Sequence, residues 1–306
     1  MGEEVNWKDF KGAIERNIHF AKGDSGRVLI VAGEAFLGAT VFAAHAALRA
    51  GVDSVYVLAP AQLTGLLSAT NPDLVVLPLP PQSQAAAITA RAGQADVLLI
   101  GPGFGVGPEQ KKLLAQVLPG LKTKLVIDAD ATKQAPLAAL KGALILANAS
   151  EYEALGEPAP GENVLVVKGP VDLIISKNHR REVPGGHPRA TVNGTGDVLA
   201  GLAAGLFAQM DDCFLTAQAA SYLLKQAAET VGGALHYGWL ASDLLDQIPK
   251  TLYEYRLFRT TKHQPTAMKR AIKRGRSLWT WRSEKTSTKT VRGEKQKKGP
   301  RTPADS

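Results

Sequence analysis

The sequence contains a single cysteine, Cys213, and no long apolar run, and each scarcity excludes a class of protein. One cysteine can neither form a disulfide within the chain nor build a cysteine-rich zinc cluster. The six histidines are scattered and lack the close spacing that is typical of metal ligands. No apolar run reaches the roughly 18 residues that a membrane-spanning helix needs. We therefore expect neither a disulfide-stapled nor a membrane-spanning protein.

The first residues lack the signals that direct a chain to a membrane or out of the cell. They contain no apolar core of a secretory signal peptide, and Asn6 stands where an N-myristoylation signal requires Ser or Thr. We therefore expect a cytoplasmic location.

Charge is distributed unevenly along the 306 residues, whose composition (45% hydrophobic, 21% charged) is that of an ordinary globular protein. Residues 257–306 hold 15 of the 36 Lys and Arg but only three of the 28 acids, so this segment carries +12 and residues 1–256 carry −4. The segment is too poor in apolar residues to offset its ordering entropy. We predict a folded domain over 1–256 and a basic, disordered tail over 257–306.

The tail has two interpretations. Its first half can form a short basic helix around 268–278, which Trp279 and Trp281 follow. Basic residues with interleaved aromatic residues are typical of segments that bind RNA or an anionic membrane. The other interpretation is a solvated extension without a partner, and the sequence leaves both open.

Short apolar runs alternate with helix-like stretches along residues 1–256, which predicts an α/β fold. The predicted strands span 28–32, 54–58, 75–77, 97–100, 125–127, 143–146 and 164–167, with a hairpin at 173–176 and 181–183. The predicted helices span 38–50, 83–93, 108–117, 132–140, 150–156, 196–209, 212–230 and 240–256. Continuous apolar strands indicate a mostly parallel sheet with helices on both faces, and such folds bind ligands at the carboxyl ends of their strands.

Two glycine-rich loops follow predicted strands, but neither completes a nucleotide-binding motif. The loop from Gly33 to Thr40 has the spacing of a P-loop, yet Ala39 stands where the phosphate-binding lysine is required. The loop from Gly101 to Gly107 has Val106 where a dinucleotide fingerprint needs glycine. These loops are either tight turns or places where the backbone approaches a ligand closely.

The sharpest chemical signal is a glycine turn before an apolar helix. Gly194, Thr195 and Gly196 precede that helix, and Asp197 lies in its first turn. Unpaired N–H groups and the helix dipole make such a terminus suitable for a phosphate. A carboxylate beside it can accept a hydroxyl proton during phosphoryl transfer. The alternative is that Asp197 only stabilises the helix dipole.

Other polar side chains follow neighbouring predicted strands. Asn148 and Glu151 could organise Mg²⁺ and its waters, or they could form a helix cap. Lys168 could meet nucleotide phosphates or be a surface lysine at a strand end. Asp128 and Asp130 could be caps, or could contact substrate or Mg²⁺.

Taken in order, these pieces resemble the ribokinase-like superfamily and, within it, the ADP/ATP-dependent NAD(P)H-hydrate dehydratases. The matching pieces are 26–33, 37–39, 46–51, 100–105, 126–131, 167–169, 193–201 and 241–249. The resemblance implies a ribokinase-like three-layer α/β/α fold for the domain at 1–256. It also implies an enzyme that phosphorylates the ring hydroxyl of NAD(P)H hydrate with ADP or ATP and Mg²⁺. Phosphate then leaves, and NADH or NADPH is restored.

The resemblance also implies roles for individual residues. Asp197 becomes the base, and Gly194, Thr195 and Gly196 become the anion site. The implied nucleotide-binding residues are Lys168, Gly169, Asp172 and Gly196. The implied substrate-binding residues are Ala39, Gly103, Gly105, Asn148 and Asp197. Independently of the resemblance, the positions of Glu151 and Asp130 after predicted strands make them the expected Mg²⁺ ligands. A homo-oligomer is expected, and an epimerase that acts beside the protein is left open.

One departure from the family pattern concerns the substrate. The family usually has His-Pro-Gly-Glu where this chain has Asn148-Ala-Ser-Glu151, and Asn193 replaces a usual glycine. The segment at 148–151 is similar to vitamin kinases of the superfamily, such as hydroxyethylthiazole kinase. A kinase for a small hydroxylated metabolite or sugar is therefore the alternative, and a non-catalytic polyanion-binding protein is a third hypothesis.

Overall fold

The structure is a computed structural model that describes residues 2–155 and 161–261. The predicted helix at 268–278, with Trp279 and Trp281, lies outside the described residues. Residues up to Arg16 and from Phe20 to Thr261 form one compact unit. Of the second unit the structure describes only 17–19, where the Asn17 side chain accepts a hydrogen bond from the backbone N–H of His19 at 2.9 Å.

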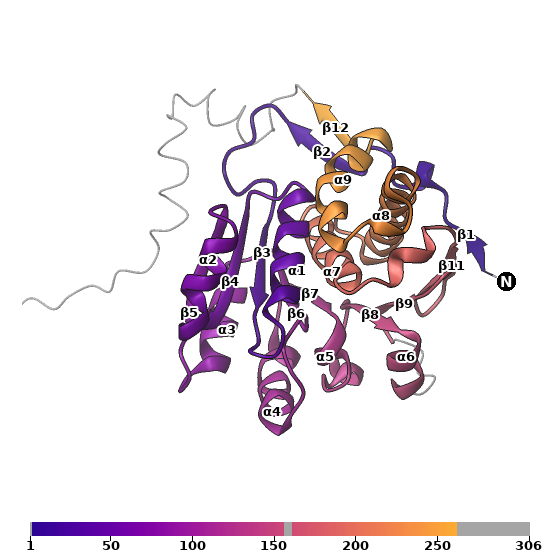
Figure 1. The fold of residues 1–306 in the computed structure, drawn as a ribbon. Helices are drawn as coiled ribbons and strands as arrows, with labels where there is room; N and C mark the ends of the chain where they lie inside the picture. Colours follow the sequence, from indigo (N-terminus) through magenta and orange to yellow (C-terminus); the bar gives the residue numbers. More distant parts are fainter. Residues whose placement is uncertain (1, 156–160, 262–306) are drawn as a thin grey trace, which may run out of the picture. The chain divides into compact units, whose positions relative to one another are not determined.

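A largely parallel sheet forms the centre of the first unit (Figure 1). Within the described residues it has ten strands, in the order β1-β11-β10-β9-β8-β7-β6-β3-β4-β5. The strands from β9 to β5 are parallel, and β10 is antiparallel to both of its neighbours, which confirms the predicted hairpin. The strand bounds are β1 Glu3–Glu4, β3 Arg27–Val31, β4 Ser54–Pro60, β5 Leu74–Leu79, β6 Val97–Ile100, β7 Lys124–Ile127, β8 Leu144–Asn148, β9 Val164–Lys168, β10 Asp172–Ile175 and β11 Arg180–Val183.

Helices cover both faces of this sheet, as the apolar runs predict. The helix bounds are α1 Leu37–Arg49, α2 Thr64–Thr70, α3 Gln84–Ala92, α4 Pro108–Val117, α5 Ala129–Thr132, α6 Ala149–Leu155, α7 Thr195–Phe207, α8 Cys213–Leu235 and α9 Ala241–Glu254. One buried cluster joins one face to α1, α7, α8 and α9, and a second joins the other face to α3 and α4. In β3, Val28 and Ile30 belong to the first cluster and Leu29 and Val31 to the second. Burial on both faces explains why β3 reads as a continuous apolar run.

A separate two-stranded sheet joins the two ends of this unit. β2 (Ile14–Asn17), whose first three residues belong to the unit, pairs with β12 (Phe258–Thr261). Leu257 is buried, so residues 257–261 are part of the folded unit and not of the disordered tail that the sequence predicts from residue 257. Within the described ranges, no helix combines the length and the apolar character required to cross a bilayer.

One predicted helix is wrong, and one helix of the structure was not predicted. The predicted helix at 132–140 is instead the end of α5 followed by a single 3-10 turn at Leu137–Ala139. Pro136 explains the break, because proline has no N–H to donate and disfavours helical geometry in the residue before it. The short helix α2 was not predicted, because its seven residues are too few to show a clear helical period. The other predicted helices and strands are confirmed to within a few residues, apart from the C-terminal end of α8.

Small residues let α1 and α7 pack closely, and this packing fixes the position of α7. A Cβ atom at Gly201 would collide with the backbone carbonyl oxygen of Ala43 in α1. A Cβ at Gly205 would lie 2.6 Å from that of Ala50 and 2.8 Å from the carbonyl oxygen of Ala47. The Ala-rich sequence of α1 and the glycines of α7 therefore serve the same contact.

Candidate active site

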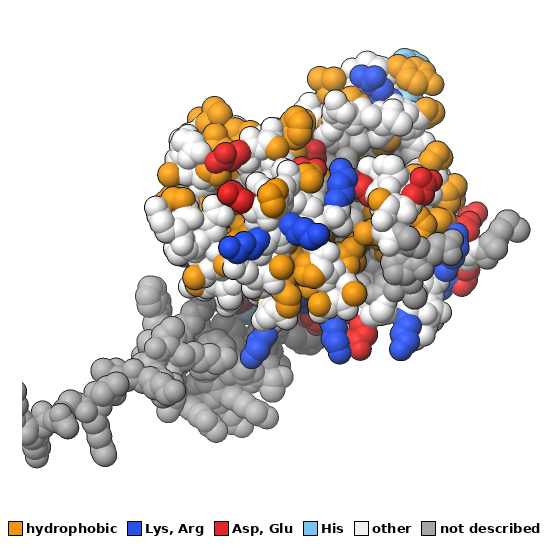
Figure 2. Space-filling view, turned by 90° about the horizontal axis from the view of Figure 1, so that it is seen from below, with side chains coloured by type: hydrophobic (Ala, Val, Ile, Leu, Met, Phe, Trp, Pro, Cys, Tyr) orange, Lys and Arg blue, Asp and Glu red, His pale blue; other side chains and the backbone are white. Residues whose placement is uncertain are grey.

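The predicted site residues lie at one edge of the sheet, where the parallel strands end. Figure 2 views the molecule from below Figure 1, the side toward which β3 points. Basic and acidic side chains are interspersed with apolar ones on this face, so no broad patch of one sign marks it (Figure 2). The site must therefore be recognised from individual contacts.

The glycine segment differs from its prediction in one respect: α7 begins at Thr195 with Gly194 as its N-cap, whereas the sequence predicts that Gly194, Thr195 and Gly196 all precede the helix. Gly194 has a φ of +98°, a left-handed conformation in which a Cβ would lie 2.7 Å from the ring of Phe42. The Thr195 hydroxyl donates to the carbonyl oxygens of Ala190 and Val192 at 2.8 and 3.0 Å, so it fastens the turn. The Thr195 N–H donates to the carbonyl oxygen of Val192 at 3.4 Å. The N–H groups that follow it in the first turn have no partner in a preceding helical turn and can bind an anion.

Asp197 lies in the first turn of α7 and is half-buried. The pKa of Asp197 is raised to about 6, mainly by burial and also by the negative charges of Asp128 and Asp130, against the opposing effect of Lys168. Such a carboxylate is ionised at neutral pH, yet it is a stronger base than an ordinary aspartate. It is therefore suited to accept a proton beside the anion site.

A buried ion pair lies next to this turn. The Lys168 ammonium, at the end of β9, lies 2.5 Å from the carboxylate of Asp128, at the end of β7. Asp128 is 1% exposed and Lys168 19% exposed. Burial raises the pKa of Asp128 against the opposing effect of Lys168. Burial acts to lower the pKa of Lys168, but the charge and hydrogen bond of Asp128, together with the charges of Glu151 and Asp197, raise that pKa above its ordinary value. A Cβ at Gly196 would lie 3.5 Å from the Lys168 ammonium, so this cation lies against the glycine turn.

Asn148 and Glu151 form the helix cap that was one of their two interpretations. The Asn148 side chain accepts from the backbone N–H of Glu151 at 2.8 Å, and the Glu151 carboxylate accepts from the backbone N–H of Asn148 at 2.9 Å. These reciprocal bonds are a capping box at the start of α6. Asn148 is nevertheless exposed, so its side chain can also meet a ligand.

The two residues predicted as Mg²⁺ ligands lie around a lysine. The Lys133 ammonium is 3.8 Å from Asp130 and 3.6 Å from Glu151. Over residues 2–155 and 161–261, no group of three or more His, Cys, Asp or Glu side chains is arranged to hold a metal ion. Asp130 and Glu151 therefore do not fit a site in which the protein alone holds Mg²⁺.

Three predicted substrate residues are brought together by the two glycine loops. A Cβ at Gly103 would collide with the carbonyl oxygen of Phe36 and lie 3.5 Å from the Cβ of Ala39. The Gly105 N–H donates to the Asp130 carboxylate at 3.0 Å, and its carbonyl accepts from Gln134 at 2.9 Å. The glycines thus allow the two loops to pack together, with Gly103 against Ala39 and Gly105 3.6 Å from the Cβ of Ala35, measured from the position of a Cβ on Gly105.

The predicted nucleotide residue Asp172 is committed to shaping a turn. Its carboxylate accepts from the Gly169 N–H at 2.9 Å and from the Ser221 hydroxyl, and it lies 3.4 Å from the Lys225 ammonium. Sequence reasoning missed Ser221 and Lys225, because they lie on α8, about 50 residues further along the chain. It also missed Lys133 and Gln134, for which no local motif gives a signal.

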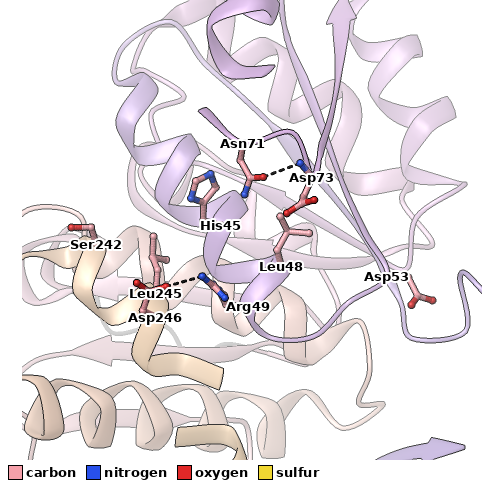
Figure 3. A pocket seen from close by; sticks show the side chains of 9 residues that line it. All are labelled: His45, Leu48, Arg49, Asp53, Asn71, Asp73, Ser242, Leu245 and Asp246. Atoms are coloured by element: carbon pink, nitrogen blue, oxygen red, sulfur yellow. Dashed lines mark hydrogen bonds and ion pairs between the residues drawn. The ribbon is translucent and has the colours of Figure 1, made fainter. Parts of the chain in front are cut away.

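One cavity, of about 570 Å³, lies away from all of these residues. Figure 3 shows that α1 and α9 line it with Arg49 and Asp246, which form an ion pair at 2.7 Å, and with His45 and Ser242. The turn before β5 contributes Asn71 and Asp73. None of the residues predicted for catalysis or binding lines this cavity, so its size alone does not identify the active site.

Known proteins with similar sequences share one description. The family model Carb_kinase, described as NAD(P)H-hydrate dehydratase, matches residues 28–250. The ADP-dependent (S)-NAD(P)H-hydrate dehydratase of Cenarchaeum symbiosum is 32% identical over 260 residues, which cover 76% of this chain and 90% of that protein. The bifunctional NAD(P)H-hydrate repair enzyme Nnr of Pyrobaculum aerophilum is 32% identical over 259 residues, which cover 76% of this chain and 52% of that protein. The chain thus spans about half the length of the bifunctional relatives.

Solved structures with the same fold include two from bacteria. A ribokinase-like superfamily protein of Enterococcus faecalis matches with a TM-score of 0.74 and 22% identity, over 83% of this chain and 96% of that chain. The ADP/ATP-dependent NAD(P)H-hydrate dehydratase of Bacillus subtilis, co-crystallised with ATP/Mg²⁺, matches with a TM-score of 0.70 and 19% identity, over 83% and 99%. These likenesses confirm the ribokinase-like α/β fold.

Proposed function

The chain belongs to the NAD(P)H-hydrate dehydratase family, as the resemblance in its sequence predicts, and from this premise we propose that it restores NADH or NADPH from the hydrated cofactor. In this reaction the hydroxyl on the hydrated nicotinamide ring is phosphorylated and phosphate is then eliminated. The observation that carries the proposal is the position of Asp197, a carboxylate with a pKa of about 6 in the first turn of α7.

The first step needs a base and a site for negative charge. Asp197 accepts the proton of the ring hydroxyl while that oxygen bonds to the terminal phosphorus of the nucleotide. The N–H groups at the start of α7 face the charge that develops on the transferring phosphoryl group. Lys168 adds a cation beside the same turn, 3.5 Å from the position of a Cβ on Gly196. The bond between the terminal phosphorus and the rest of the nucleotide breaks as the new bond forms, and the shortened nucleotide leaves. The ring carbon–oxygen bond then breaks, the phosphate departs with the ring oxygen, and loss of a proton from the adjacent ring carbon restores the ring double bond.

The two substrates approach Asp197 from different elements. We place the hydrated cofactor against Ala39, Gly103 and Gly105, with the exposed Asn148 on the same edge of the sheet. We place the nucleotide along the turn from Lys168 to Asp172. Mg²⁺ would enter bound to the nucleotide phosphates, since Lys133 lies between Asp130 and Glu151.

We propose ADP as the phosphoryl donor and the (S) hydrate as the substrate. Two relatives that this chain spans by nine-tenths or more of their length are named ADP-dependent (S)-NAD(P)H-hydrate dehydratases. A separate epimerase that converts the other epimer of the hydrate is a natural partner for such an enzyme. The kinase alternative has less support. A hydroxyethylthiazole kinase of Pyrococcus horikoshii matches with a TM-score of 0.53 and 15% identity, which are both lower than the 0.70 and 19% of the Bacillus subtilis dehydratase.

Three further assignments remain proposals. A cytoplasmic location accords with the single cysteine, and a homo-oligomer accords with the family resemblance.

Contact of the basic tail with RNA or an anionic membrane rests on its net charge of +12. Removing residues 262–306 should abolish retention on RNA and on vesicles rich in phosphatidylserine. Unchanged binding to both after the truncation would refute the contact.

The central experiment is recovery of reduced-nicotinamide absorbance from NADH hydrate with Mg²⁺ and either ADP or ATP. The intact protein should give recovery, and Asp197→Asn should lower the rate by about 10²–10⁴-fold. The matched control is Asp246→Asn, which changes an exposed aspartate of the cavity in Figure 3. No recovery by the intact protein with either nucleotide would refute the proposed function. Loss of activity in Asp246→Asn alone would place the active site at that cavity instead.

A further inference from the structure

We propose that Asp128 is a positioning residue, which holds the Lys168 ammonium against the Gly194–Gly196 turn and thereby sets the electrostatic surroundings in which Asp197 acts. The inference rests on the proposed function for its link to catalysis. The reaction described above uses Asp197, the start of α7 and Lys168, and it gives Asp128 no part.

Asp128 forms a buried ion pair between two segments that are distant in the sequence. Its carboxylate is 1% exposed and lies 2.5 Å from the Lys168 ammonium, although the two residues are 40 positions apart in the chain. Burying a carboxylate is costly unless a partner stabilises it, and an apolar residue in this place would serve the core as well or better. The charge at position 128 therefore has a use other than packing.

The backbone around Asp128 is also specialised. Gly101 has a φ of +132°, and any Cβ there would collide with the carbonyl oxygen of Asp128. The next residue, Ala129, has a φ of +49°, a conformation that a residue with a Cβ rarely adopts. Conformations of this kind persist where the surroundings impose them, often at functional sites. Two neighbouring departures from ordinary backbone geometry thus fix the place of one carboxylate.

The charges that surround this pair come from several elements. Asp128, Lys168 and Asp130 act on Asp197, and Glu151 acts on both members of the pair. Lys133 lies near Asp130 and Glu151. The described cluster thus contains four carboxylates and two ammonium groups, the latter being Lys133 and Lys168. Removing one carboxylate changes this balance without emptying the site.

The direction of the effect follows from the charges. Burial is the largest influence that raises the pKa of Asp197, the charge of Asp128 raises it further, and Lys168 lowers it. Replacing Asp128 by Asn removes the second influence and leaves Lys168 uncompensated. The pKa of Asp197 should therefore fall below about 6, and Asp197 should become a weaker base.

The first test is a ¹³C NMR titration of the Asp197 carboxyl carbon in the protein without nucleotide, with Asp197→Asn to identify the signal. Asp128→Asn should lower the titration midpoint by about one pH unit. The matched control is Asp211→Asn, which breaks the exposed ion pair between Asp211 and Lys124 and should leave the midpoint unchanged. This arm needs no dehydratase activity, so it stands apart from the proposed function. An unmoved midpoint in a folded Asp128→Asn protein would overturn the inference.

The second test follows the pH dependence of dehydration. The acid limb of the kcat/KM profile should move to lower pH in Asp128→Asn, and kcat should fall about tenfold with little change in the KM for the hydrate. A fall in activity with the acid limb in place would mean that Asp128 is merely structural. If the intact enzyme turned over no hydrate, the proposed function would fail. The NMR titration would still test whether Asp128 affects the pKa of Asp197.

A third measurement covers the case in which Asp128→Asn does not fold. In the intact protein, a Lys168 ammonium held by Asp128 should give a sharp ¹⁵N signal that exchanges slowly with water. Lys177, an exposed lysine, is the internal comparison. Exchange at Lys168 as fast as at Lys177 would show that the ammonium is not held, and it would overturn the inference without any variant.

Discussion

Asn148 and Glu151 exchange two hydrogen bonds across the junction of β8 and α6. The amide oxygen of Asn148 accepts from the N–H of Glu151 at 2.8 Å, and the carboxylate of Glu151 accepts from the N–H of Asn148 at 2.9 Å. Glu151 is buried, and its second carboxylate oxygen lies 3.6 Å from the Lys133 ammonium. One pair of residues thus starts a helix and anchors a lysine at the edge of the active site.

Asn148→Ala should destabilise the protein by about 1 kcal/mol, because it removes the oxygen that caps α6. Ser150→Ala is the control. The Ser150 hydroxyl donates an exposed hydrogen bond to the same Asn148 oxygen, and the loss of that bond should cost less than about 0.5 kcal/mol. Urea unfolding at neutral pH measures both. Equal stability of Asn148→Ala and the unchanged protein would mean that the cap contributes nothing.

Asp197→Asn should make the protein more stable at neutral pH even though it removes the proposed catalytic base. The pKa of Asp197 is raised from 3.8 to about 6, so the folded protein favours the protonated form. The resulting stabilisation is present below about pH 4 and is lost as the pH rises through about 6. Asn carries no charge and escapes that loss. After allowance for partial exposure to solvent, the gain is about 1–2 kcal/mol.

The measurement for Asp197→Asn is thermal unfolding at several pH values between 4 and 8. The variant and the unchanged protein should have similar stability at pH 4 and diverge as the pH rises to 7. A constant difference at every pH would contradict the charge-based explanation. A gain of stability with a loss of activity is typical of residues whose environment serves catalysis.

Lys168→Met should cost about 3–5 kcal/mol at pH 7, because it leaves the buried carboxylate of Asp128 without its cation. Burial already raises the pKa of Asp128, and loss of Lys168 raises it further, so the carboxyl group binds a proton in the folded variant at acid pH. The deficit should therefore shrink as the pH falls from 7 to 5. Lys133→Met should cost less, about 1 kcal/mol, because the Lys133 side chain is 46% exposed and the buried Glu151 carboxylate keeps the hydrogen bond from the Asn148 N–H. Urea titrations at pH 7 and pH 5 measure the free energy of unfolding of each variant. A loss of stability in Lys168→Met that did not depend on pH would refute this explanation.

The sequence predicts those parts of the molecule that depend on neighbours along the chain. The strand at 28–31 is recognisable because both of its faces are buried and every residue is apolar. The left-handed Gly194 at the N-cap of α7 and the position of Asp197 in the first turn follow from the local sequence Gly-Thr-Gly-Asp, which predicts a turn followed by a helix. The capping box was foreseen as one of two alternatives for Asn148 and Glu151.

What the sequence could not predict depends on contacts between distant segments. Lys133 lies between Asp130 and Glu151, but nothing near residue 133 indicates that a cation would stand where Mg²⁺ was expected. Asp172 reads as a nucleotide ligand because it follows Lys168 and Gly169, whereas its partner Ser221 belongs to a helix about 50 residues later. Such pairings follow from the order of strands in the sheet, which no local pattern specifies.

Gly201→Ala should destabilise the protein and lower its activity, because the packing of α7 on α1 leaves no room for a methyl group. A Cβ at residue 201 would collide with the carbonyl oxygen of Ala43, a backbone atom that cannot turn aside. Relief requires the two helices to move apart, at a cost of about 1–3 kcal/mol. That movement would also displace the start of α7, where Asp197 and the anion site lie.

The matched control is Gly233→Ala in the exposed part of α8, where a Cβ would meet no atom within 4 Å. Alanine is favoured over glycine within a helix, so this variant should gain about 0.5–1 kcal/mol and keep full activity. Guanidinium unfolding compares the two substitutions, which add the same methyl group. If Gly201→Ala were as stable as Gly233→Ala, the contact between α1 and α7 would be looser than the structure indicates. It would then be unable to fix the position of Asp197.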